Sequence, residues 1–225
     1  MRDMRSPRRR KHLCKGGAYD SIELAALRVL HLKWNKKKRA RSPFPFVHVG
    51  REDVHHLKFD LSNEDFKDSR KMVDSLNQSL CFLATLWSMG WVHGDIHPAT
   101  NFVVYKDELY LYDFEPGQFR CSWPPREEEP EPLLSPLDAI AYDCYKFSEL
   151  CASFLSRFQK NASSLLLFRL GFDLRWYNPD CRHGDEWAFR QTPQVQKDFA
   201  TFLSRVFAAC NICQSDVAPH VLQYL

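Results

Sequence analysis

Apolar residues recur at every third or fourth position ahead of Gly90, and this spacing predicts one long amphipathic helix. The positions on its apolar face are Val73, Leu76, Leu80, Leu83 and Trp87. The polar run 62–65 (Ser-Asn-Glu-Asp) is expected to begin the helix. Gly90 is expected to end it, because glycine readily adopts the left-handed backbone that follows a helix.

Two short stretches after this helix follow the pattern of strands. Residues 102–105 (Phe-Val-Val-Tyr) and 109–112 (Leu-Tyr-Leu-Tyr) are rich in β-branched and aromatic side chains. The polar residues 106–108 separate them, so together they predict a β-hairpin. Residues 44–49 and 54–59 predict a second pair of strands on the same grounds.

Helical patterns surround these strands. A capping-box pattern begins at Asp20, where a polar residue is followed three positions later by Glu23. The further predicted helices are 22–32, 137–155, 163–170, 195–209 and 217–225. Helices that accompany separate pairs of strands predict an α+β fold.

Charge is unevenly distributed along the 225 residues, although the formal net charge is only +3. Residues 1–41 contain 14 Lys and Arg against 3 acidic residues, whereas the rest of the chain contains 17 against 25. The basic runs 8–11 and 36–41 are typical of nuclear-localisation or nucleic-acid-binding segments, or of a solvated tail and loop. No apolar run approaches the ~20 residues that span a bilayer. We therefore expect an intracellular protein of the nucleus or cytoplasm with no membrane contact.

Eight cysteines are present, several of them in apolar helical context where a thiol packs as a small hydrophobic group. A disulfide framework is not expected in a chain without a secretory signal. Cys181, His183, Cys210 and Cys213 include one Cys-x-x-Cys pair and have the ligand types of a structural zinc site. Zinc binding and simple packing are both open at this point.

Two short motifs flank the predicted hairpin and carry the most specific pattern in the chain. The first is residues 93–98, His-Gly-Asp-Ile-His-Pro, and the second is residues 113–115, Asp-Phe-Glu. They place Asp95 and Asp113 on either side of one hairpin, which suits a phosphotransferase that must position a hydroxyl and a metal-bound nucleotide. The pair resembles the catalytic loop and metal-binding motif of the protein-kinase-like superfamily. It is most similar to the aminoglycoside- and choline-kinase branch.

This resemblance implies a bilobal kinase-like fold, ATP and Mg²⁺ as ligands, and transfer of the γ-phosphate to a hydroxyl of a protein or a small molecule. In that scheme Asp95 is the catalytic residue that orients the attacking hydroxyl. Asp113 and Asn101 bind the metal. Lys15, paired with Glu23, contacts the phosphates.

Three further residues gain a role from the same resemblance. His93 is expected to support the backbone of the motif, and His97 is expected to line the acceptor side. Asp143 resembles the aspartate that braces the backbone of the catalytic loop.

The resemblance also predicts how the chain is divided. Residues 1–13 are expected to be a disordered basic tail, residues 14–60 a reduced N-lobe, and residues 61–225 a mostly helical C-lobe. The fourteen residues before Lys15 are too few for two strands, a glycine-rich phosphate loop and a third strand. ATP would therefore lack its usual lid.

A second departure from the family pattern concerns the asparagine. The family places it five positions after the aspartate, where this chain has Thr100, and Asn101 follows one position later. Either the loop bulges by one residue and Asn101 still reaches the metal, or Thr100 offers a hydroxyl ligand.

Two other functions stay open on the sequence alone. The missing glycine-rich loop and the shifted asparagine favour a pseudokinase that acts as a binding scaffold. The basic residues 1–41 could bind nucleic acid, with an affinity that falls steeply as salt rises.

Overall fold

The computed structural model describes a little over half of the chain. The described residues are 47–49, 54–56, 65–97, 101–105, 107–111, 135–177, 189 and 192–225. Within them the protein combines five α-helices, three 3₁₀ turns and two antiparallel strand pairs. This confirms the α+β prediction at the level of fold class. The predicted tail 1–13 and the helix predicted at 22–32 lie outside the described residues.

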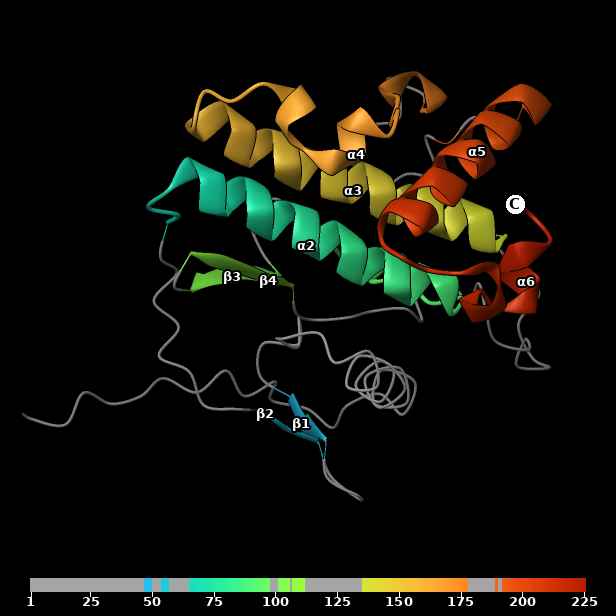
Figure 1. Ribbon diagram of the computed structural model, residues 1–225, viewed down its shortest axis with the longest axis horizontal. Helices are drawn as coiled ribbons and strands as arrows, with labels where there is room; N and C mark the ends of the chain where they lie inside the picture. The colour runs from blue at the N-terminus through green and yellow to red at the C-terminus, as the bar shows by residue number, and fades with distance from the viewer. Residues whose placement is uncertain are drawn as a thin grey trace, which may run out of the picture.

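Helix α2 (Ser69–Ser88) is the central element, and it contacts β4, α3, α4 and α5 (Figure 1). Asp68 caps its N-terminus, because Asp68 Oδ1 accepts a 2.6 Å hydrogen bond from the Arg70 N–H. The prediction that residues 62–65 begin this helix was wrong. Residues 65–68 are not helical. Phe66 in this segment is buried, and its ring packs edge-on against Phe154 with 5.2 Å between the ring centroids.

A Schellman motif ends α2, as the glycine predicted. Gly90 has φ +79°, its N–H donates to Trp87 O (2.8 Å), and the Trp91 N–H donates to Leu86 O (3.2 Å). The C-terminal part of the chain closes over this end of the helix. The Ala218 N–H donates to Ser88 O at 2.7 Å, and the His220 ring occupies the space that a Cβ on Gly90 would take.

The predicted hairpin after the motif is present. Strand β3 (Phe102–Tyr105) pairs antiparallel with β4 (Glu108–Leu111), which begins one residue earlier than predicted. Asp107 forms the turn with φ +61° and accepts hydrogen bonds from the Lys67 N–H (2.6 Å) and Lys71 Nζ (3.0 Å). These bonds tie the hairpin to the start of α2.

A second hairpin is formed by β1 (Val47–Val49) and β2 (Val54–His56), which pair antiparallel. Both strands lie inside the predicted ranges 44–49 and 54–59, so the prediction of two paired strands there is confirmed.

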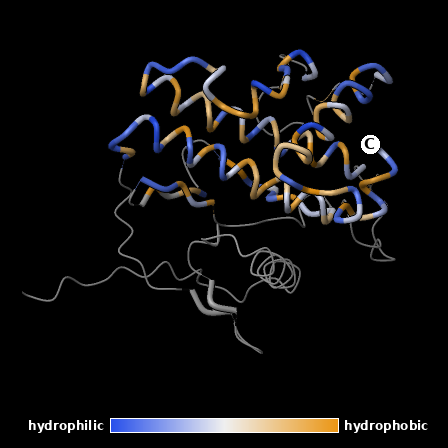
Figure 2. The backbone as a smooth tube through the Cα atoms, viewed as in Figure 1, coloured by the Kyte–Doolittle hydropathy of each residue, from blue (hydrophilic) through white to orange (hydrophobic). Residues whose placement is uncertain are grey.

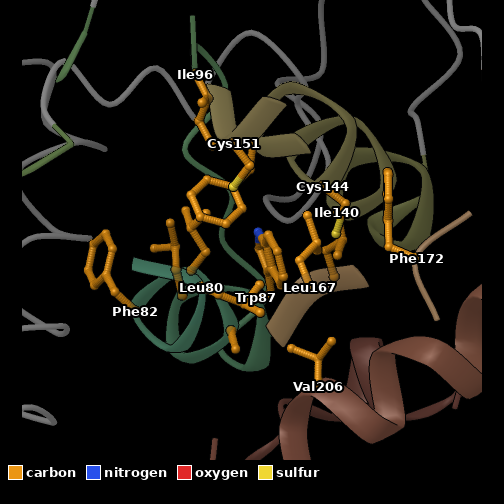
Figure 3. Packing of buried hydrophobic residues seen from close by; sticks show 14 of the residues in the cluster. Leu80, Phe82, Trp87, Ile96, Ile140, Cys144, Cys151, Leu167, Phe172 and Val206 are labelled. Atoms are coloured by element: carbon orange, nitrogen blue, oxygen red, sulfur yellow. The ribbon is translucent and has the colours of Figure 1, made fainter. Parts of the chain in front are cut away.

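Helix α3 (Pro136–Arg157) confirms the helix predicted at 137–155 and runs antiparallel to α2 in Figure 1. Ser135 and Asp138 form a capping box at its start, and Pro136 occupies the first turn. Figure 3 shows Trp87 reaching from α2 into the space that α3 lines with Ile140 and Cys144. The Trp87 side chain is fully buried there.

The remaining helices cover α2 and α3. Helix α5 (Pro193–Ala209) confirms the helix predicted at 195–209, and it packs against the core through an aromatic cluster. The cluster consists of Phe172, Trp176, Tyr177, Phe189, Phe199 and Phe202. Helices α4 (Leu166–Arg169) and α6 (Pro219–Leu222) are single turns, much shorter than the helices predicted at 163–170 and 217–225.

Hydrophobic positions of the helices gather on the surfaces that face one another, and hydrophilic positions face outward (Figure 2). Among the described residues, no helix combines the length and the apolar character that crossing a membrane would need.

The end of α2 allows a double-mutant test. Substituting Gly90→Ala places a Cβ 1.9 Å from His220 Nε2 and forces alanine into a left-handed backbone. We expect this variant to lose about 2–4 kcal/mol of unfolding free energy in urea titrations. In a His220→Ala background the clash disappears, so the same substitution should cost only about 1–2 kcal/mol. Equal costs in the two backgrounds would contradict the predicted contact between Gly90 and His220.

Candidate active site

Residues 91–97, called here the HGD loop, leave the end of α2 and carry the first motif. Trp91, Val92 and Ile96 are buried in the core, and His93 has no exposed surface. Asp95 lies among them but is only half-buried. The apolar anchors on both sides therefore fix the loop while its one carboxylate stays accessible.

Asp143 of α3 holds the backbone of this loop. Its Oδ2 accepts hydrogen bonds from the His93 N–H (2.6 Å) and from Trp87 Nε1 (3.0 Å), and its Oδ1 accepts one from the Gly94 N–H (3.0 Å). Gly94 has φ +86°, a conformation that favours glycine. The predicted bracing role of Asp143 is confirmed.

Burial dominates the protonation of Asp143. The side chain is completely buried, and desolvation raises its pKa to about 6, although the three hydrogen bonds lower it in part. Above that pH a buried negative charge is present, and among the described residues the indole and the two backbone N–H groups stabilise it. The position of the HGD loop is thus coupled to a charge inside the core.

His93 supports the loop from within, as predicted. The Asp95 N–H donates to His93 Nδ1 at 3.3 Å, so the imidazole accepts a bond from the backbone that carries the carboxylate. The ring does not face solvent. His97, predicted to line an acceptor side, is exposed at the end of the loop.

Asn101 meets Asp95 in space. Its Nδ2 donates to the Asp95 backbone carbonyl at 3.0 Å and also to the carboxylate oxygen Oδ2. Asn101 has φ +59°, a left-handed backbone that asparagine tolerates better than most residues. Of the two alternatives for the shifted asparagine, the geometry favours the one in which Asn101 still reaches the site. Thr100 lies outside the described residues.

Tyr142 of α3 is an additional polar group near this carboxylate, and Lys146 lies beside Tyr142. Burial raises the pKa of Tyr142, and the negative charges of Asp95 and Asp143 raise it further, so the phenol belongs to the same electrostatic environment. Lys146 Nζ lies 5.8 Å from the centre of the Tyr142 ring and 2.9 Å from Glu149 Oε2. Neither residue belongs to a motif of the sequence. They could have been found in the sequence only through Asp143, because Tyr142 precedes it by one position and Lys146 follows it by three.

The rest of the predicted site lies outside the described residues. This applies to Lys15, Glu23 and Asp113, and also to Cys181 and His183 of the suggested zinc site. In the part of the chain that the structure describes, no three His, Cys, Asp or Glu side chains gather closely enough to hold a metal ion. The described portion of the site is therefore Asp95, Asn101 and the groups that hold them.

An asparagine at position 143 could not accept all three of the hydrogen bonds that Asp143 accepts. Wherever the amide nitrogen points, it faces an N–H donor of the loop or of Trp87, so at least one buried hydrogen bond is lost. We expect Asp143→Ala, which removes every acceptor, to lower the unfolding free energy by about 2–4 kcal/mol. Asp143→Asn is the matched control, because it removes the charge but keeps one acceptor oxygen, so it should cost less than Asp143→Ala. An equal or larger loss for Asp143→Asn would contradict this assignment.

The raised pKa of Asp143 also predicts a pH dependence. Its folded-state pKa of about 6 exceeds the unfolded value of about 3.9. Between these two pH values the folded state keeps a proton that the unfolded state has released, so protonation of Asp143 stabilises the folded state. This contribution to the unfolding free energy is fully present below pH ~4 and is lost as pH rises through ~6. We expect a fall of about 3 kcal/mol in unfolding free energy between those pH values. Urea titrations at several pH values should show this fall in the wild type and not in Asp143→Asn. Parallel curves for the two proteins would refute it.

Comparison with known proteins adds no relative to this geometry. No protein-family model matches the chain, no curated protein matches it, and no solved structure matches it.

Proposed function

We propose that this protein is an ATP-dependent phosphotransferase with a protein-kinase-like fold and a hydroxyl group as acceptor. One observation carries the proposal. The accessible carboxylate of Asp95 stands beside the Asn101 amide on a loop whose backbone is braced by the buried Asp143. A polar pair fixed in this way suits a reaction that depends mainly on positioning.

Asp95 is proposed to receive the acceptor. Its carboxylate accepts a hydrogen bond from the attacking hydroxyl and directs the oxygen toward the terminal phosphorus. The new P–O bond forms as the bond to the leaving diphosphate breaks, and the hydroxyl proton passes to the carboxylate. The hydrogen bond from the Asp95 N–H to His93 Nδ1 fixes the backbone from which the carboxylate projects.

The oxygen atoms of Asp95 and Asn101 are of the types that bind Mg²⁺, the metal that such a reaction uses. Carboxylate and amide oxygens are the protein ligands that Mg²⁺ accepts, together with phosphate and water. Because Asn101 Nδ2 is directed to Asp95, the amide oxygen is the atom that Asn101 can offer to a cation. Asp113 is proposed as the second ligand, and Lys15 with Glu23 as the phosphate-binding pair. Bound Mg²⁺–ATP would supply the phosphoryl group and neutralise its charge.

A catalytically inactive scaffold is the competing proposal. It is favoured by the hydrogen bond from Asn101 Nδ2 to Asp95 Oδ2, which occupies an oxygen that a catalytic carboxylate offers to its acceptor. In this case the HGD loop would be a rigid element for binding a partner. The two proposals differ in nucleotide binding and in phosphate transfer, so both can be measured.

The first test is transfer of labelled phosphate from ATP with Mg²⁺ to a generic protein, a peptide pool, and a set of amino-alcohol and sugar acceptors. We expect Asp95→Ala to reduce transfer about 10²–10⁴-fold, because it removes the group that positions the hydroxyl and takes its proton. Asp74→Ala is the matched control, since Asp74 is an exposed carboxylate on α2 outside the site. This control should keep wild-type activity.

Nucleotide-induced thermal stabilisation distinguishes the outcomes of this experiment. Stabilisation by Mg²⁺–ATP that is lost in Asp113→Ala, with transfer lost in Asp95→Ala, supports the phosphotransferase. Equal transfer by the wild type and Asp95→Ala would overturn the role of Asp95. No transfer and no stabilisation in any variant would favour the scaffold.

A further inference from the structure

Two cysteines that are distant in the sequence meet between α2 and the end of α5. Cys81 and Cys210 are separated by 129 positions, yet their sulfur atoms lie 2.7 Å apart. Neither is in a disulfide. A disulfide requires a sulfur–sulfur separation of about 2.05 Å, so a shift of less than ~1 Å would bring the pair to bonding distance.

The surroundings of the pair differ from those of the other described helical cysteines. Cys144 and Cys151 of α3 are completely buried, so a reagent from solution cannot reach either thiol. Cys81 is only half-buried, whereas Cys210 has 1% of its surface exposed. A reagent from solution can therefore reach Cys81, and Cys210 lies directly behind it.

From this arrangement we propose that Cys81 and Cys210 form a reversible intramolecular disulfide when the protein meets a small-molecule disulfide such as oxidised glutathione. The Cys81 thiolate attacks one glutathione sulfur, forming a mixed disulfide and releasing one glutathione thiolate. The Cys210 thiolate then attacks the Cys81 sulfur and releases the second. The two protein thiols lose two electrons and two protons, and one glutathione disulfide becomes two glutathione molecules.

A bond between Cys210 and Cys213 is the obvious competitor, because the two form a Cys-x-x-Cys pair. The local backbone turns the two residues apart. Cys210 caps α5, Asn211 has φ +57°, and the Ile212 N–H returns to Phe207 O at 2.9 Å. Cys213 is exposed and begins the next turn, η4 (Gln214–Asp216), while the Cys210 sulfur is directed at α2.

The proposed bond would join the central helix to the C-terminal part of the fold. Helix α2 leads into the HGD loop, and the segment after α5 already contacts the end of α2 through the hydrogen bond from the Ala218 N–H to Ser88 O. A cross-link over 129 positions restricts the unfolded chain strongly. The oxidised protein should therefore be more stable than the reduced one. This inference is independent of phosphotransferase activity.

Peptide mapping tests the proposal on the whole chain. The reduced protein is incubated with oxidised glutathione, alkylated with iodoacetamide and digested with trypsin without reductant. Cleavage after Lys71, Lys106 and Arg205 places Cys81 in peptide 72–106 and both Cys210 and Cys213 in peptide 206–225. We expect these two peptides to be joined by a disulfide, and to separate with dithiothreitol. The other cysteines fall in different tryptic peptides.

Single variants identify the bonded pair. The link should persist in Cys213→Ser and disappear in Cys81→Ser and Cys210→Ser. Oxidation should raise Tm by about 5–10 °C in the wild type and in Cys213→Ser, but not in Cys81→Ser, whose half-buried position tolerates the change. A disulfide within peptide 206–225, a lasting glutathione adduct on Cys81, or no oxidation of Cys81 would each overturn the proposal.

Discussion

The carboxylate of Asp143 accepts three hydrogen bonds inside the core, and the rest of the site depends on them. One comes from the indole of α2 and two from the backbone of the HGD loop, so a single side chain of α3 fixes the helix and the loop together. An apolar residue at this position would leave three buried donors unsatisfied. These three hydrogen bonds offset part of the cost of burying the charge.

Left-handed backbone conformations complete the arrangement around that anchor. Gly90 turns the chain out of α2, Gly94 presents its N–H to Asp143, and Asn101 brings its amide back to Asp95. Between these turns the apolar side chains are buried and the Asp95 carboxylate is accessible. Stability and chemistry are thereby assigned to different residues of one short segment. A rigid polar pair of this kind suits phosphoryl transfer, the function proposed above.

The sequence predicted those features that depend on local chemistry. The spacing of Leu76, Leu80 and Leu83 predicted α2, Gly90 predicted its end, and alternating β-branched and aromatic residues predicted the hairpin. The start of α2 was wrong, because the packing of Phe66 against Phe154 is a contact between distant segments. The roles of Tyr142 and the meeting of Cys81 with Cys210 likewise depend on how helices pack, which no local pattern encodes. Asp143 was found through family resemblance rather than spacing.

The residues that support the HGD loop are synthesised after the loop itself. The loop leaves the ribosome before the residues that hold it, since Asp143 follows His93 by 50 positions and Ala218 follows Ser88 much later still. Until those residues have been made, the polar backbone of the loop has no partner from α3 and the end of α2 has none from the C-terminal segment. The site would thus take shape only when the growing chain has delivered both of its supports.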